Sequence, residues 1–180
     1  MILLGKNARV KFRPLTDDDL PMLHRWLNDP AVVRWWEDTD VSWLGVVREC
    51  GSTNTDPVEH WIAVHDGADI GWIQTYAAAD FDDEDETRHW FRLGVRRTAA
   101  GIDYLIGPST GRHRGLGTLM IDTFVTDIVF GRHPEWTEVC ASPMTANVAS
   151  WRALEKAGFT TRGTFFDEHG PARLMVRQRP

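Results

Sequence analysis

Residues 101–130 read GIDYLIGPSTGRHRGLGTLMIDTFVTDIVF, and this stretch decides the fold of the chain. The apolar segment 101–107 predicts a buried strand, and from Leu116 to Phe130 apolar residues recur every three or four positions, as on one face of a helix. A loop rich in arginine and glycine separates the two. This order of strand, loop and helix predicts an α/β protein with the loop at the carboxyl end of a strand.

The loop has the chemistry of a phosphate site. The N–H groups of a first helical turn have no partner inside the helix, and glycine lets an anion approach the backbone. The alternative is an ordinary glycine-containing loop with solvated arginines. Neither a Walker loop nor a G-x-G-x-x-G fingerprint fits the spacing. The residues expected to bind a pyrophosphate are Arg112, His113, Arg114, Gly115, Leu116, Gly117 and Thr118.

Composition narrows the class of protein. A length of 180 residues with 42% hydrophobic and 26% charged residues predicts a single globular domain over residues 1–180. The net charge of −6 argues against nucleic acid as a partner and suits a cationic ligand, although solubility explains it equally well. The cysteines and histidines show no metal-ligand spacing, so we expect no metal. Without a signal peptide or an apolar run of membrane-spanning length, we expect a cytoplasmic protein with no membrane partner.

Hydrophobic periodicity divides the rest of the chain into strands and helices. Asp66-Gly67 predicts a hairpin turn, and the acidic segment 80–86 is expected to be a solvated loop. The expected strands are 9–14, 58–65, 70–77, 90–95, 101–107, 137–141, 159–165 and 172–177. The expected helices are 17–27, 31–36, 41–49, 116–130 and 148–157, with Gly131 ending the fourth.

A second signature, NVASWRALEKAGF, occupies residues 147–159. Its pattern N-x-x-[AS]-x-x-x-x-E-K-x-G-F, together with R-x-x-G-x-G in the loop, resembles the GCN5-related N-acetyltransferase (GNAT) superfamily, in which the two segments bracket coenzyme A. The resemblance implies a GNAT fold: a mixed, mostly antiparallel central sheet flanked by helices, with strands splayed at the acetyl-CoA site.

Within this superfamily the chain is most similar to the aminoglycoside 6'-N-acetyltransferases, over nearly its whole length. The stretches that carry the likeness are 23–28, 33–36, 70–76, 101–103 and 170–172. The resemblance implies an acetyl-CoA-dependent enzyme of antibiotic resistance. It would acetylate the 6'-amino group of aminoglycosides by direct transfer, as a monomer or a homodimer.

The resemblance also assigns roles to single residues. Asp103 matches the aspartate of the family's Gly-Ile-Asp motif and is the candidate catalytic base, the alternative being a carboxylate that only binds the amine. Asn147 is either a cofactor contact or purely a helix cap. The expected contacts of the cofactor arm are Ile102, Tyr104, Leu105, Asn147 and Ser150.

The acceptor site is expected to be aromatic and acidic. Trp35 and Trp36 are adjacent and cannot both face one core, so one of them is expected to line a cleft. Within the acidic segment, three aspartates are candidates for holding a cationic substrate, against the alternative of a solvated charge run. The expected acceptor contacts are Trp35, Trp36, Tyr76, Asp80, Asp82, Asp83, Asp103, Ser142 and His169.

Three residues depart from the family pattern. Leu154 stands where many members carry a tyrosine that can protonate the leaving thiolate, and Ser142 and His169 stand where similar enzymes carry carboxylates. The departures keep two alternatives open. One is an acyltransferase for a hydroxylysine-type siderophore precursor or another small amine. The other is a non-catalytic acyl-CoA-binding module.

Overall fold

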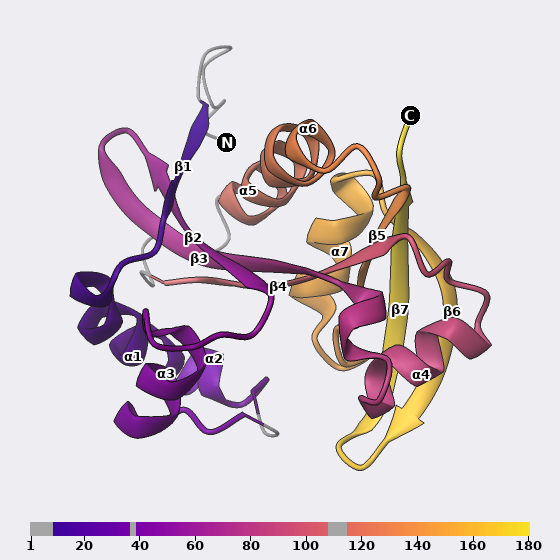
Figure 1. Cartoon of the computed structure of the whole chain (residues 1–180), viewed down its shortest axis with the longest axis horizontal. Helices are drawn as coiled ribbons and strands as arrows, with labels where there is room; N and C mark the ends of the chain where they lie inside the picture. The colour runs from indigo at the N-terminus through magenta and orange to yellow at the C-terminus, as the bar shows by residue number, and fades with distance from the viewer. Residues whose placement is uncertain (1–8, 37–38, 108–114) are drawn as a thin grey trace.

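One seven-stranded sheet organises the chain, with the strand order β1-β2-β3-β4-β5-β7-β6 (Figure 1). The computed structural model describes residues 9–36, 39–107 and 115–180. Neighbouring strands are antiparallel except β4 and β5, which are parallel, so the sheet is mixed and mostly antiparallel, as expected. The strands are β1 Val10–Pro14, β2 Val58–His65, β3 Ala68–Ala77, β4 Ala99–Ile106, β5 Glu138–Ala141, β6 Thr160–Asp167 and β7 Gly170–Gln178.

Helices cover both faces of this sheet. Trp72 packs against the helices after β1, whereas its neighbour Ile73 packs against the helices of the second half, because successive strand side chains point to opposite faces. Figure 1 shows α1, α2 and α3 on the side of β2 and β3 opposite to α5 and α6. The helices are α1 Leu20–Leu27, α2 Pro30–Val33, α3 Trp43–Cys50, α4 Asp85–Arg92, α5 Leu116–Thr123, α6 Phe130–Arg132 and α7 Val148–Lys156.

The prediction of a strand at 90–95 is wrong, because the first half of that segment belongs to α4 and the second half forms the turn that follows it. Trp90 is 1% exposed and Thr87 is 2% exposed, and their spacing of three places both on the buried side of a helix. Asp85 and Glu86 form the first turn, where the helix dipole favours negative charge. Part of the acidic segment therefore begins a helix instead of forming a loop.

The long helix also differs from its expected end. Residues 116–132 form α5, a π-helical segment over Phe124–Val129 and then α6, so the helical stretch runs through Gly131 instead of stopping there. The turn at Asp66-Gly67 is confirmed, with φ of 50° and 78° at the two residues. Within the described residues, no helix is both long and apolar enough to cross a membrane.

Candidate active site

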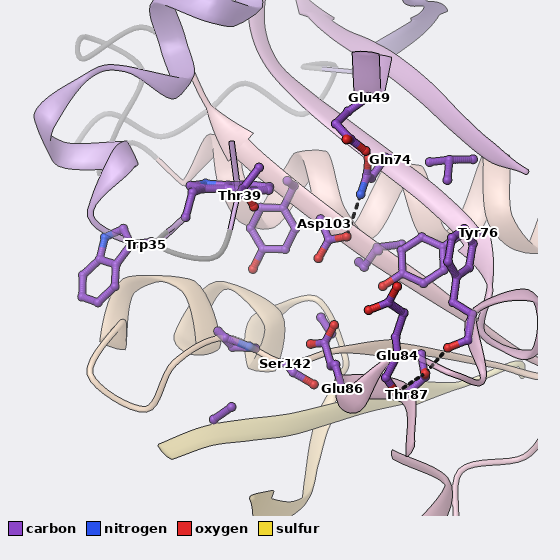
Figure 2. Close-up of a pocket in the computed structure, with 18 of the residues that line it drawn as sticks. Trp35, Thr39, Glu49, Gln74, Tyr76, Glu84, Glu86, Thr87, Asp103 and Ser142 are labelled. Atoms are coloured by element: carbon purple, nitrogen blue, oxygen red, sulfur yellow. Dashed lines mark hydrogen bonds between the residues drawn. The ribbon is translucent and has the colours of Figure 1, made fainter. Parts of the chain in front are cut away.

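A cavity of about 1020 Å³ lies beside the middle of the sheet. Its lining residues come from α1, α3, α4, the centre of β4, the end of β5, the start of α7 and the β6–β7 turn. Figure 2 shows Asp103 near its centre, with Glu84 and Glu86 of the α4 region across the open space from it. The cavity thus joins segments that are far apart in the sequence around one strand carboxylate.

A gap in the sheet opens into this cavity. β4 and β5 pair from Ala99 to Gly101, and from there to Ile106 the only described strand that pairs with β4 is β3. The Gly107 N–H donates to the Ile70 carbonyl at 3.1 Å, so the main-chain groups of every second residue of β4 point towards β3. The intervening residues, Ile102 and Tyr104, turn their main-chain groups to the gap, where an extended molecule could bond to them.

Three polar side chains form a row across the sheet at the cavity. The strand register places His60 beside Gln74 and Gln74 beside Asp103. The Gln74 Nε2 group donates to Asp103 Oδ2 at 2.8 Å, which fixes the orientation of the carboxylate. His60 stacks on Trp72, and burial lowers its pKa to about 4 despite the opposing influence of nearby Glu49, so the imidazole is neutral at pH 7.

The lining is strongly acidic. Among the described residues it includes nine carboxylate side chains and only two guanidinium groups, so the cavity favours a cation. Arg48 is paired with Glu49 at 2.8 Å and Asp40 at 3.5 Å, and carboxylates outnumber guanidinium groups in the described part of the lining. The carboxylates are Asp40, Glu49, Asp56, Glu84, Asp85, Glu86, Asp103, Asp167 and Glu168.

The start of α5 has the features of an anion site. Gly115 precedes the helix with φ of 79°, a left-handed conformation that glycine adopts without strain. Among the described residues, no side chain caps this end of the helix, and the N–H groups of a first helical turn can bind an anion. Leu116, Gly117 and Thr118 form the first turn, whereas the expected phosphate contacts Arg112, His113 and Arg114 lie outside the described residues.

The expected contacts of the cofactor arm are largely brought together. Ile102, Tyr104, Asn147 and Ser150 all line the cavity, and the Tyr104 hydroxyl lies 2.7 Å from Ser150 Oγ. Asn147 also caps α7, since its side chain accepts from the Ser150 N–H at 3.3 Å. Leu105 is placed differently: its main chain faces β3 and its side chain is buried against α1, so it lies away from the gap.

The expected acceptor contacts divide into two groups. Trp35, Trp36, Tyr76, Asp103, Ser142 and His169 line the cavity, whereas Asp80, Asp82 and Asp83 do not. The Asp82 carboxylate instead pairs with Arg97 at 2.8 Å, on the surface. Both members of the tryptophan pair line the cavity, and Trp36 also contacts Trp72, with 5.7 Å between ring centroids.

Ser142 has a structural partner as well. The indole N–H of buried Trp90 donates to Ser142 Oγ, and a tryptophan N–H in the interior needs such an acceptor. Leu154 is fully buried in the core and lines no part of the cavity. At these two positions, where the family pattern carries a tyrosine and a carboxylate, this chain therefore has no ionisable side chain.

The acidic residues Glu49, Glu84 and Glu86 and the positioning residue Gln74 were missed by sequence reasoning. Gln74 lies within the 70–76 stretch, and strand alternation would have placed it on the face of Trp72. Glu84 and Glu86 required the α4 helix to be recognised, and the signal was the spacing from Thr87 to Trp90. Among the described residues, no group of three histidine, cysteine or acidic side chains is arranged to hold a metal ion.

Known proteins share this architecture. The profile of the acetyltransferase (GNAT) domain family matches residues 16–166. The chain is 34% identical to aminoglycoside N(6')-acetyltransferase type 1 of Klebsiella pneumoniae, across 99% of this chain and 87% of the relative. It is 27% identical to N(6)-hydroxylysine O-acetyltransferase of Escherichia coli, across 89% of this chain and 49% of that protein. A solved structure of AAC(6')-Ib with paromomycin and acetyl-CoA is 31% identical and superposes with a TM-score of 0.82, covering 95% of this chain and 94% of the other.

Proposed function

Because the chain belongs to the GNAT acetyltransferase family, we propose that it transfers the acetyl group of acetyl-CoA to the 6'-amino group of aminoglycoside antibiotics. The observation that carries this proposal is the acidic cavity, which surrounds Asp103 and opens onto the gap between β4 and β5. The acidic part suits a polycationic acceptor, and the gap suits an extended acyl carrier. The relatives named for this activity support the same assignment.

The residues at the gap fit coenzyme A. Its arm carries amide groups, which match the outward-facing main-chain groups of Ile102 and Tyr104. Its pyrophosphate matches the first-turn N–H groups of α5, which follow Gly115. When bound, acetyl-CoA supplies an acetyl thioester, an activated acyl group. A backbone N–H of β4 at the gap would stabilise the negative charge that develops on the thioester oxygen.

Asp103 is the proposed base. An ammonium group is not a nucleophile, so the acceptor amine must lose a proton before it attacks the thioester. The Asp103 carboxylate lies in the acidic cavity and is oriented by Gln74, so that Oδ1 or Oδ2 can take that proton directly or through a water molecule. The neighbouring carboxylates hold the remainder of the polyamine, which orients the reacting amine.

Tyr104 is the proposed proton donor to the leaving thiolate. Burial raises the pKa of its hydroxyl, so the phenol is protonated at neutral pH. The hydroxyl also lies against Ser150 Oγ at 2.7 Å, on the first turn of α7 and one helical turn before Leu154. Tyr104 of β4 can therefore place a phenol close to Leu154, the helix position at which many family members carry a tyrosine.

The hydroxylysine acetyltransferase match supports the second candidate function. That acceptor is an amino acid, with a carboxylate as well as an amine. The described lining holds only two guanidinium groups beside nine carboxylates, and one of the two, Arg48, is already paired with two acidic side chains, so an amino-acid carboxylate would find few cationic partners. The acidic cavity therefore favours the polyamine acceptor.

Residues 1–180 form one catalytic domain in this proposal, active as a monomer or a homodimer. One continuous sheet and a family match over residues 16–166 support the single domain. We place the activity in the cytoplasm, where acetyl-CoA is available.

The test compares two antibiotics that differ only at the reacting position. Neomycin carries an amine at position 6', and paromomycin carries a hydroxyl there. With acetyl-CoA and purified protein, we expect thiol release with neomycin, a product acetylated at the 6'-nitrogen by mass spectrometry and NMR, and little release with paromomycin. Equal rates with both would show that the 6'-amine is not the acceptor. Turnover of N-hydroxylysine but of neither antibiotic would favour the second candidate.

A further inference from the structure

The arm of the acyl donor has a direction along β4. In the proposed complex its pyrophosphate lies at the start of α5, where a Cβ atom at Gly117 would lie 3.8 Å from Ile106 Cγ1, at the carboxyl end of the strand. From there an extended arm can bond to the main chain of Tyr104 and then of Ile102, so it runs back towards the start of the strand. The thioester, at the other end of the arm, therefore lies near Ile102 and beside Asp103.

The gap between the strands closes just beyond this point. The pairing of β4 with β5 ends at Gly101, opposite Cys140. Cys140 is fully buried, and on the other face of the sheet Ala100 and Ile102 belong to the packed core. An acyl group that continues the line of the arm past the thioester therefore enters a short closed space, which we call the acyl pocket.

The Tyr76 ring covers the closed end of the acyl pocket on the cavity face. Tyr76 lies opposite Gly101 in the β3–β4 register, and a Cβ atom at residue 101 would lie 2.3 Å from Tyr76 Cζ and 2.7 Å from the hydroxyl oxygen. The ring therefore rests on the glycine backbone. Tyr76 and Ala141 both line the cavity, and Tyr76 belongs to the same buried cluster as Cys140 of β5. The outer part of the ring thus lies where the gap ends.

The ring is packed in place and carries no charge. Phe81 packs edge-on against it, with 5.1 Å between ring centroids, and Tyr76 is only 8% exposed. Burial raises the pKa of the phenol well above its ordinary value, so the hydroxyl is protonated at neutral pH. A buried, neutral ring is suited to act as a steric wall, because packed protein interiors yield little to an added methylene group.

The open part of the cavity is the other direction that a longer acyl chain could take. The acceptor amine attacks the thioester from the side of Asp103, so the cavity must hold the acceptor at that moment. An acyl chain turned into the cavity would occupy the same space and exclude the acceptor. A longer chain is therefore opposed in both directions, by the ring or by the acceptor.

We propose that Tyr76, resting on Gly101, limits the acyl donor to acetyl-CoA by closing the end of the acyl pocket. The inference rests on the proposed acetyl transfer and defines its donor class: two-carbon acyl thioesters in preference to those with four carbons or more. The role is steric, so it depends on the aromatic ring of Tyr76 and not on its hydroxyl group.

The test compares acetyl-CoA with butyryl-CoA as donors to neomycin. For the wild type we expect kcat/KM to be about 100-fold or more higher with acetyl-CoA, since each surplus methylene in a tight pocket costs about 10-fold or more. Tyr76→Leu removes the outer part of the ring and should lower this preference by about 10-fold or more, by raising kcat/KM for butyryl-CoA. A purely structural defect would instead lower activity with both donors and leave their ratio unchanged.

Two controls accompany this variant. Tyr76→Phe keeps the ring and should leave the donor preference within about 3-fold of wild type. Trp35→Ala removes another aromatic side chain of the lining, which Figure 2 shows on the opposite side of Asp103 from Tyr76. Whatever its effect on neomycin binding, it should change the ratio between the donors by less than about 2-fold, because the two sites are independent.

The inference is overturned if the wild type uses butyryl-CoA as well as acetyl-CoA, or if Tyr76→Leu keeps the wild-type preference. Either result leaves the proposed acetyl transfer intact. The acyl pocket lies on the donor side, so the same comparison applies with N-hydroxylysine if neomycin is not the acceptor. A wild type that turns over acetyl-CoA with neither acceptor overturns both proposals. Circular dichroism establishes that each variant is folded, and Tyr76→Met, which fills a core site flexibly, is a second test of the same prediction.

Discussion

Asp103 owes its setting to the residue beside it on the next strand. The Gln74 amide donates to Asp103 Oδ2 at 2.8 Å, and the pair lies where the acidic cavity meets the β4–β5 gap. A side-chain amide can orient a carboxylate without neutralising it, so the carboxylate keeps its capacity to accept a proton. The catalytic proposal therefore depends on a cross-strand pair, and the pair can be tested at both members.

We predict that Asp103→Asn lowers kcat by about 100-fold or more, because an amide cannot accept the proton of the amine. The affinity for acetyl-CoA, measured by calorimetry, should stay within about 3-fold of wild type. Gln74→Leu keeps the base and should lower kcat by only about 10-fold, the value of one charged hydrogen bond. Retention of full activity by Asp103→Asn would remove this carboxylate from the reaction.

At the scale of single residues, the sequence predicted the motif positions but not their partners. Asp103, Tyr104 and Ser150 belong to quoted motifs, and all three line the cavity. Glu84 could not be placed in the same way, because a charge run on a surface and a charge run on a cavity wall look alike until the neighbouring helix is located. Strand register and helix phase supply that information, and both are tertiary properties.

The helix α5 illustrates prediction at the scale of an element. Its start at Leu116 follows the sequence signal closely, since Gly115 adopts the left-handed conformation just before it. The segment 90–95 was misassigned because aromatic residues favour strands, whereas packing of Trp90 against the β5–β6–β7 half of the sheet favours the helix α4. Tertiary burial there overrides local propensity.

Gly117 tests the role of the α5 start. A Cβ atom at residue 117 would lie 3.8 Å from Ile106 Cγ1 and 3.9 Å from Ala153 Cβ, which are ordinary contacts. Gly117→Ala should therefore fold normally and bind coenzyme A within about 5-fold of wild type. Gly117→Asp adds negative charge beside the first-turn N–H groups and should weaken binding by about 100-fold or more. Calorimetry with coenzyme A measures both, and equal affinities would contradict a phosphate site at this helix.

At the scale of the whole molecule, one ion-pair network ties together segments distant in sequence. The Arg13 guanidinium of β1 contacts Asp19 at 2.7 Å and Asp69 at the start of β3 at 3.0 Å. Asp19 also accepts from the Thr16 N–H at 2.9 Å, which caps the turn leading into α1. The Asp19 side chain is only 11% exposed, so solvent screens this network weakly.

This network predicts how global stability varies with pH. The hydrogen bond from Arg13 lowers the pKa of Asp19 to about 2, from an ordinary value of 3.8. A depressed pKa stabilises the fold above the unfolded value, and the stabilisation is lost as the pH falls from about 4 to about 2. Asp19→Asn should therefore lower the free energy of unfolding by about 2 kcal/mol at pH 7. Urea titrations of both proteins from pH 7 to pH 2 measure the difference, and a constant difference would contradict the argument.

The fold class itself was the most predictable property. The two sequence signatures, one in the loop that follows β4 and the other in the segment that follows β5, predicted the α/β architecture. The mixed sheet confirms this prediction. The acidic cavity was less predictable, because its lining combines α3, α4, β4 and the β6–β7 turn, and no local pattern relates these segments. Net charge alone did not reveal it, since acidic groups serve solubility equally well.

The short junction between β4 and β5 also bears on how the protein avoids self-association. A strand with unpaired N–H and C=O groups is a template for pairing with other chains, and sheets usually carry such strands at their outer edges. Among the described residues, the stretch of β4 after Gly101 has no strand partner on its β5 side, and this stretch lies in the middle of the sheet, between its two halves. The main-chain groups of β4 are thus kept away from the outer edges of the sheet, where strands of other chains can pair.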